Sequence, residues 1–84
     1  MKKKKRPVLD LHGYKSDDVF DAVDKFLMKY GSSPHNSIFI MTGKGKGIVK
    51  KLVSDYLKTA GYHFKNQQLE NGSINEGVLE VFLN

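Results

Sequence analysis

A run of alternating glycine and lysine, Thr42-Gly43-Lys44-Gly45-Lys46-Gly47, separates two apolar segments and constrains the fold more than any other stretch. It follows residues 38–41, which are all apolar as in a buried strand, and it precedes a helical pattern that starts at Ile48. Glycine allows positive φ and close approach of the backbone to a ligand. A helix N-terminus adds unpaired N–H groups and partial positive charge. The run therefore predicts a strand-to-helix turn that holds an anion, with phosphate as the simplest ligand; an ordinary flexible turn is the alternative.

The loop does not match either of two familiar phosphate-binding motifs. The P-loop pattern G-x-x-x-x-G-K-[ST] is absent, and residues 43–47 lack the spacing of the dinucleotide pattern G-x-G-x-x-G. The phosphate prediction consequently depends on what the rest of the chain places beside the loop.

Composition favours a single small domain with a polyanionic partner. The chain has 84 residues, no cysteine and a net charge of +5, and no apolar run approaches the ~20 residues of a membrane span. Residues 1–6 form a basic arm that we expect to be disordered; the arm, which ends in Arg6, either contacts nucleic acid or only solubilises the chain. Because no apolar run follows these cations, we do not expect a signal peptide, and we predict a cytoplasmic monomer without a membrane partner.

The periodicity of apolar residues predicts a strand and then a helix in the first third of the chain. Residues 7–12 alternate as a strand, with Leu9 and Leu11 on one face. Ser16 is the predicted N-cap of the helix, and Gly31 is its predicted C-cap. The apolar stripe along this helix comprises Val19, Phe20, Val23, Phe26, Leu27 and Tyr30.

The same reasoning predicts a second helix and two further strands. The second apolar stripe comprises Ile48, Val49, Leu52, Val53, Tyr56 and Leu57, and Gly61 closes it. Residues 62–67 and 77–83 are predicted strands, joined at an Asn71-Gly72 turn or at a loop that extends to Asn75 or beyond. The order β-α-β-α-β-β predicts an α/β (α+β) two-layer sandwich, with two helices on a mixed four-stranded sheet in one domain, residues 7–84.

A second group of polar residues should lie beside the glycine loop. Asp10, His12 and Gly13 end the first strand, and the strand at 38–41 should run parallel to it, so Asp10, His12, Thr42 and Lys44 should meet at one edge. In this arrangement His12 would act as base or acid, Asp10 would orient it, and Lys44 with the loop amides would stabilise charge on phosphorus. The alternative is structural: Asp10 caps the Gly13 turn and His12 is a structural bridge.

The combined motifs resemble the Smr (small MutS-related) domain family over about residues 8–83. The matching stretches are Leu9-Asp10-Leu11-His12-Gly13, Thr42-Gly43-Lys44-Gly45 with Lys46-Gly47, and Asn75-Glu76-Gly77-Val78. The resemblance implies a two-layer β-α-β-α-β-β fold and nucleic-acid binding. It also implies nicking or single-strand endonuclease activity on DNA or RNA, in DNA repair or at stalled ribosomes. It assigns Asp10, His12 and Gly13 to the first motif and residues 42–47 to the second.

The chain departs from the family where many members carry an arginine. Lys50 and Lys51 stand there, keeping the charge without the bidentate geometry of a guanidinium. A non-catalytic nucleic-acid- or ribosome-binding module, or a domain that binds phosphate ligands or proteins, therefore remains an alternative to the endonuclease. The histidines His12, His35 and His63 lie on separate elements, so we predict no structural metal, while dependence on a divalent cation stays open.

Overall fold

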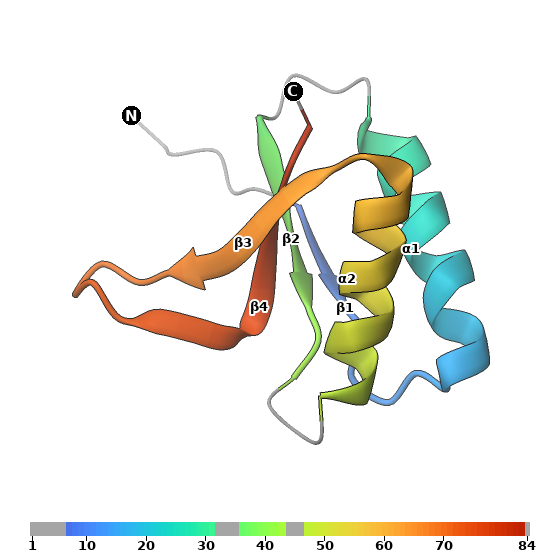
Figure 1. Cartoon of the computed structure of the whole chain (residues 1–84), viewed down its shortest axis with the longest axis horizontal. Coiled ribbons are helices and arrows are strands. Elements are labelled where there is room, and N and C mark those ends of the chain that lie inside the picture. Colours follow the sequence, from blue (N-terminus) through green and yellow to red (C-terminus); the bar gives the residue numbers. More distant parts are fainter. Residues whose placement is uncertain (1–6, 32–35, 44–46, 84) are drawn as a thin grey trace.

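The computed structural model describes residues 7–31, 36–43 and 47–83. Its strands and helices follow one another in the predicted order (Figure 1). They are β1 (Val8–Asp10), α1 (Ser16–Tyr30), β2 (Ser37–Met41), α2 (Ile48–Ala60), β3 (His63–Gln68) and β4 (Ile74–Phe82). The predicted order and fold class are therefore confirmed. Within the described ranges, neither helix is long and apolar enough to cross a membrane.

The four strands form one mixed sheet in the order β1-β2-β4-β3. β1 and β2 are parallel, whereas β4 runs antiparallel to both β2 and β3. The connections from β1 to β2 and from β2 to β3 thus both join parallel strands and both proceed in the same direction across the sheet. Right-handed crossovers of this kind place their helices on one face, and Figure 1 shows α1 and α2 together on one side.

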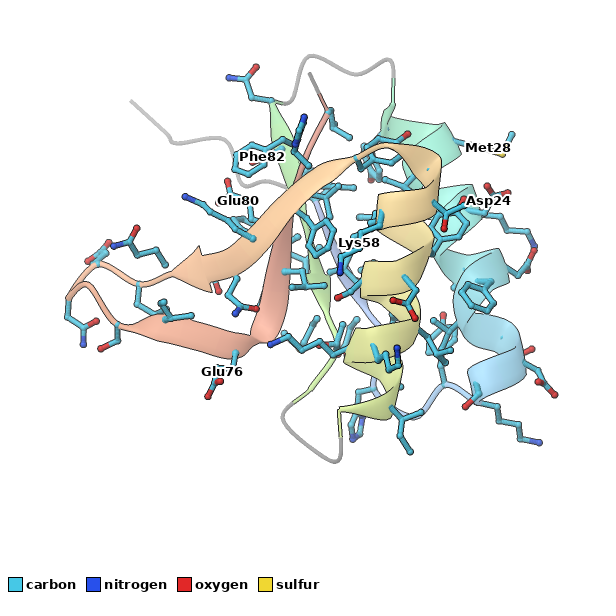
Figure 2. The ribbon with its side chains drawn as sticks, in the orientation of Figure 1. Asp24, Met28, Lys58, Glu76, Glu80 and Phe82 are labelled. Atoms are coloured by element: carbon cyan, nitrogen blue, oxygen red, sulfur yellow. The ribbon has the colours of Figure 1, made fainter. Side chains whose placement is uncertain are left out.

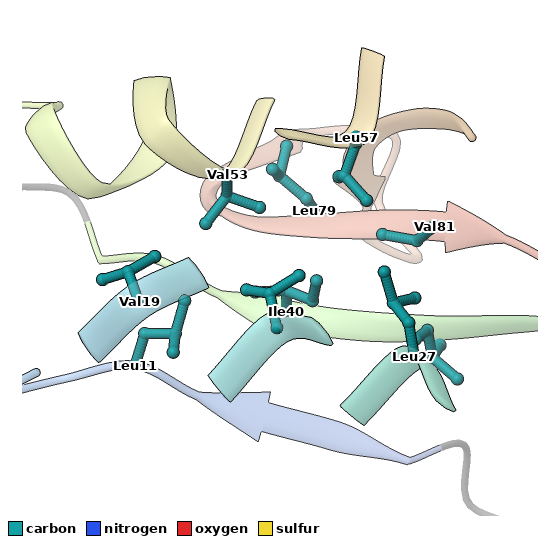
Figure 3. Packing of buried hydrophobic residues seen from close by; sticks show 10 residues of the cluster. Leu11, Val19, Leu27, Ile40, Val53, Leu57, Leu79 and Val81 are labelled. Atoms are coloured by element: carbon teal, nitrogen blue, oxygen red, sulfur yellow. The ribbon is translucent and has the colours of Figure 1, made fainter. Parts of the chain in front are cut away.

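The hydrophobic core lies between that face of the sheet and the two helices (Figure 3). Its buried members are Leu11 after β1, Ile38 and Ile40 of β2, Leu79 and Val81 of β4, Val19, Val23 and Leu27 of α1, and Val53 and Leu57 of α2. Full burial of one such side chain contributes roughly 1.5–3 kcal/mol. The core therefore fixes both helices on the sheet and, with them, the positions of the helix N-termini.

Several predicted boundaries were wrong by one to three residues. Lys15 is the N-cap of α1, so Ser16 is the first helical residue and not the cap. β1 is shorter than residues 7–12 because a turn begins at Leu11, whose carbonyl oxygen accepts the Tyr14 N–H (N···O 3.0 Å). The β3–β4 connection comprises residues 69–73, longer than the two-residue turn, and β4 begins three residues early.

Two residues of the predicted apolar stripes are exposed. Phe20 is 43% exposed and Ile48 is 57% exposed. Phe20 lies at the boundary between the helices, where its ring stands 6.0 Å from that of Tyr56 (centroid to centroid). Ile48 is the first residue of α2, at the end of the helical layer. Helical spacing predicted most of the buried positions on each helix correctly, but it cannot show which apolar residues lie outside the core.

Candidate nucleic-acid interface

The ends of two parallel strands bring predicted site residues together at one edge of the sheet. Asp10 of β1 pairs with Met41 of β2, and the Leu11 N–H donates to the carbonyl oxygen of Met41 (N···O 3.0 Å). Figure 1 shows β1 and β2 pointing to the lower edge, where α1 and α2 also begin. We call the residues at this end, 10–13, 42–43 and 47–51, the glycine-loop edge.

Asp10 stabilises the turn that follows β1. Its Oδ1 accepts a hydrogen bond from the backbone N–H of His12 (N···O 2.9 Å), and Gly13 completes the turn at φ +82°. Among the described residues, no hydrogen bond joins the Asp10 carboxylate to the His12 imidazole. The side chain of His12 is exposed at the edge. This geometry fits the structural alternative for Asp10, whereas the role of His12 in proton transfer stays a prediction.

The start of the glycine loop is held by Gly77 of β4. The carbonyl oxygen of Gly77 accepts hydrogen bonds from the backbone N–H groups of Thr42 (N···O 2.8 Å) and Gly43 (N···O 3.0 Å). Gly43 itself has a φ of +82°, a conformation that glycine adopts without strain. These two amides therefore have an acceptor within the fold, and the phosphate role predicted for Thr42 and Gly43 stays a prediction.

The bond between the Thr42 N–H and the Gly77 carbonyl continues the β2–β4 pairing beyond Met41 and Val78. On the other side of β4, the pairing with β3 is irregular. Asn66 pairs with Leu79, but the next residue, Gln67, pairs with Asn75, so residues 76–78 of β4 have no β3 partner. The Asn75 side chain supports this bulge: its Oδ1 accepts the Gly77 N–H (N···O 3.0 Å). Sequence reasoning assigned no site role to residues 75–77, although an Asn two residues before a strand glycine is a signal for a local side-chain bond and a bulge.

The N-terminus of α2 lies at this edge, and no side chain of the described residues caps it. Gly47 is its N-cap at φ +80°, makes no side-chain hydrogen bond, and no acidic residue occupies the first turn. The helix bonds begin with the Lys51 N–H donating to the Gly47 carbonyl oxygen (N···O 2.9 Å), so the N–H groups before Lys51 have no intrahelical acceptor. Lys50 is half-buried, and Lys51 forms an exposed pair with Asp55 (N···O 3.1 Å). The arrangement favours an anion in front of α2.

The structure thus assembles Asp10, His12, Gly13, Thr42, Gly43, Gly47, Lys50 and Lys51 at one edge. Arg6, Lys44, Gly45, Lys46 and His35 lie outside the described residues, and their predicted roles stay predictions. Among the residues that the structure describes, no three His, Asp or Glu side chains gather as metal ligands would.

The Smr domain model matches residues 9–84 of the chain. The chain belongs to the Smr domain family. The match includes Asp10, His12 and Gly13, residues 42–47, and the bulge at residues 75–77. The predicted family is therefore confirmed.

Relatives of this Smr domain include much longer bacterial proteins. Endonuclease MutS2 of Staphylococcus saprophyticus is 36% identical over 73 residues, which cover 87% of this chain and 9% of the relative. Endonuclease MutS2 of Helicobacter pylori is 35% identical over 69 residues, covering 82% of this chain and 9% of the relative. The chain thus spans about a tenth of the length of these relatives.

A solved structure has the same fold as this Smr domain. The solution structure of the SMR domain of NEDD4-binding protein 2 superimposes with a TM-score of 0.63 and 24% sequence identity. The comparison covers 100% of this chain and 92% of the other. It supports the two-layer architecture alone.

Proposed function

We propose that this Smr domain binds the phosphodiester backbone of DNA or RNA at the glycine-loop edge and nicks it. The observation that carries the proposal is the start of α2, which has no capping side chain and no acidic first-turn residue, beside the ends of β1 and β2. Free N–H groups and Lys50 at that point suit a phosphate. The net charge of +5 favours a polyanion, and the MutS2 relatives are endonucleases by name.

His12 is the proposed proton-transfer group. Its exposed imidazole lies on the strand end next to the loop. It would accept the proton of the attacking hydroxyl or water, or donate one to the leaving oxygen, while the α2 terminus and the lysines hold the phosphate. The Asp10 carboxylate accepts a hydrogen bond from the His12 backbone N–H. It would therefore position His12 by holding the main chain of the turn and not by bonding to the imidazole.

A non-catalytic nucleic-acid-binding module is the second candidate. The hydrogen bond from the His12 backbone to Asp10 favours it, because the carboxylate does not orient the imidazole. Either function would suit a monomer in the cytoplasm that works with DNA repair machinery or beside ribosomes. Residues 1–6 are proposed to be a basic arm that adds phosphate contacts to those of the domain at residues 7–84.

Cleavage assays with His12→Ala separate the two candidates. Loss of a general acid or base lowers a rate by about 10²–10⁴-fold, so single-turnover nicking of circular DNA or structured RNA should fall by that factor while binding stays nearly unchanged. His63→Ala is the matched control, because His63 is an exposed histidine on β3. Wild-type protein that binds both substrates and nicks neither would leave the binding module as the function.

Deleting residues 1–6 tests the contribution of the basic arm. Each neutralised duplex phosphate contributes roughly −0.9 to the slope of log K against log salt. The shortened protein should bind DNA more weakly and with a flatter slope, yet unfold at the same urea concentration. Identical slopes for the two proteins would remove the arm from the interface.

A further inference from the structure

A hollow lies between the outer faces of α1 and α2. Its volume is about 360 Å³, and the described residues that line it are Phe20, Asp55, Tyr56 and Thr59. We call these four residues the helix groove. The rings of Phe20 and Tyr56 meet at an interplanar angle of 38°, and Phe20 is 43% exposed. The groove therefore exposes aromatic surface that does not pack into the hydrophobic core.

One face of α1 forms a wall beside the helix groove and combines acidic and apolar side chains. Asp17, Phe20, Asp24 and Met28 follow at intervals of three and four residues, so they share one face of α1. The Tyr56 hydroxyl donates to Asp24 Oδ1 (O···O 2.7 Å), which ties this wall to α2. That hydrogen bond, with burial, raises the pKa of Tyr56 to about 12. Figure 2 shows Asp24 on the side of α1 that faces α2, and Met28, 76% exposed, further along α1.

Among the described residues, no lysine forms an ion pair with Asp17 or Asp24. Lys25 pairs with Asp21 on α1 (N···O 3.1 Å), and Lys51 pairs with Asp55 on α2 (N···O 3.1 Å). Figure 2 shows Lys58 projecting from the side of α2 that is turned away from α1. Asp17 and Asp24 thus leave a net negative wall beside an apolar floor. Such a surface repels phosphate and attracts cationic side chains.

We propose that the helix groove docks a partner protein through a segment that presents an apolar side chain flanked by lysines or arginines. An aromatic or aliphatic anchor would fill the hollow between Phe20 and Tyr56, as the central residues of protein interfaces do. The flanking cations would face Asp17 and Asp24. The groove and the glycine-loop edge share no residue, but they adjoin where Lys51 of the edge pairs with Asp55 of the groove (N···O 3.1 Å).

The test uses defined peptides and the full chain labelled with ¹⁵N. The probe is a capped octapeptide in which one leucine and one phenylalanine stand among lysines and arginines. Two comparison peptides replace either the apolar pair with serine or the cations with glutamate. The probe should shift the amide signals of Phe20, Asp55, Tyr56 and Thr59, and both comparison peptides should bind at least about fivefold more weakly.

Variants of the groove complete the experiment. Phe20→Ala should weaken probe binding by about tenfold, as truncation of an interface anchor does. Leu69→Ala is the matched control, because Leu69 is 42% exposed on the β3–β4 connection and should have no effect. Asp24→Asn keeps an acceptor for the Tyr56 hydroxyl but removes the charge, and should weaken binding most at low salt. Each folded variant should retain the wild-type spectrum away from the groove.

Four results would overturn the proposal. They are unchanged probe binding by folded Phe20→Ala, no binding of the probe at millimolar concentration, equal binding of the serine peptide, and groove signals that shift with an oligonucleotide. Sedimentation provides a further check. A dimer that is lost on Phe20→Ala and on deletion of residues 1–6 would assign the groove to the basic arm of a second copy instead.

Discussion

Two helices begin at the same edge of this Smr domain, and their first turns are built differently. α1 carries Asp17 and Asp18 in its first turn, where negative charge compensates the helix dipole. α2 follows Gly47 in a left-handed conformation and has no acidic residue in its first turn. Neither N-cap residue supplies a side-chain hydrogen bond.

The difference separates a terminus that serves the fold from one that is open to a ligand. The charges of α1 stabilise that helix without any outside group. The positive end of α2 is compensated by nothing in the described part of the chain, so an anion would stabilise it. The contrast therefore specifies the proposed phosphate position more narrowly than the net charge of the chain does.

A carboxylate in the first turn of α2 should give this helix the compensating charge that α1 already has. Of the substitutions considered, this one should weaken oligonucleotide binding the most. Two like charges about 4 Å apart repel by ~1 kcal/mol in water and ~4 kcal/mol near a protein surface, so Ile48→Glu should weaken oligonucleotide binding by an amount in that range. The fold should gain ~0.3–1 kcal/mol from the compensated dipole. Fluorescence anisotropy and urea unfolding measure the two effects, which have opposite signs.

Ile48→Gln is the control, because it has the size of Glu without its charge, and Ile48 is 57% exposed. If Ile48→Glu and Ile48→Gln bind the oligonucleotide equally well, the phosphate does not lie in front of α2.

Substituting Gly47, the N-cap of α2, should have an intermediate effect on oligonucleotide binding. Gly47 has a φ of +80°, and a Cβ there would meet no atom within 4 Å. Gly47→Ala should therefore cost only backbone strain, ~1–2 kcal/mol of unfolding free energy. Binding should also weaken, because relief of that strain would shift the loop against the helix.

Gly61→Ala gives the comparison at the other end of α2. Gly61 has a φ of +84° and equally open surroundings, so thermal unfolding should show the same loss of stability. Oligonucleotide binding should not change, because Gly61 lies at the C-terminus of the helix. A similar loss of binding in both variants would mean that strain anywhere in α2, and not the loop, controls affinity.

Removing one of the acidic charges in the first turn of α1 should have the smallest effect on oligonucleotide binding. Asp17→Asn or Asp18→Asn should cost ~0.3–1 kcal/mol of stability, because the dipole of α1 loses its compensation. Affinity for an oligonucleotide should stay equal or rise slightly at low salt, since a negative charge leaves the edge. A drop in affinity would show that the two termini do not have the separate roles assigned here.

The features that could be predicted from the sequence are those that follow from the local spacing of apolar residues. Spacings of three and four placed Val53 and Leu57 in the core, and alternation placed Leu79 and Val81 on one face. Parallel pairing then followed from the β-α-β order, and it brought Asp10 beside the end of β2 as expected.

What the sequence could not predict depends on contacts between distant segments. Gly77 meets the start of the glycine loop because β4 lies next to β2 in the sheet, so that the pairing of Met41 with Val78 continues to Thr42 and Gly77. Phe20 fits an apolar helical stripe, but the structure places it beside Tyr56 of α2 and outside the core, where it is 43% exposed. The Asp10 carboxylate had two partners of similar reach, the imidazole and the backbone of His12, and the geometry of the turn decided between them.

The Gly77 carbonyl oxygen has a consequence for how this loop can vary. It fixes one end of the loop through the main-chain amides of Thr42 and Gly43, and Gly47 fixes the other end as the start of α2. Because these anchors belong to the main chain, the two ends of the loop should stay in place whichever side chain stands at position 42.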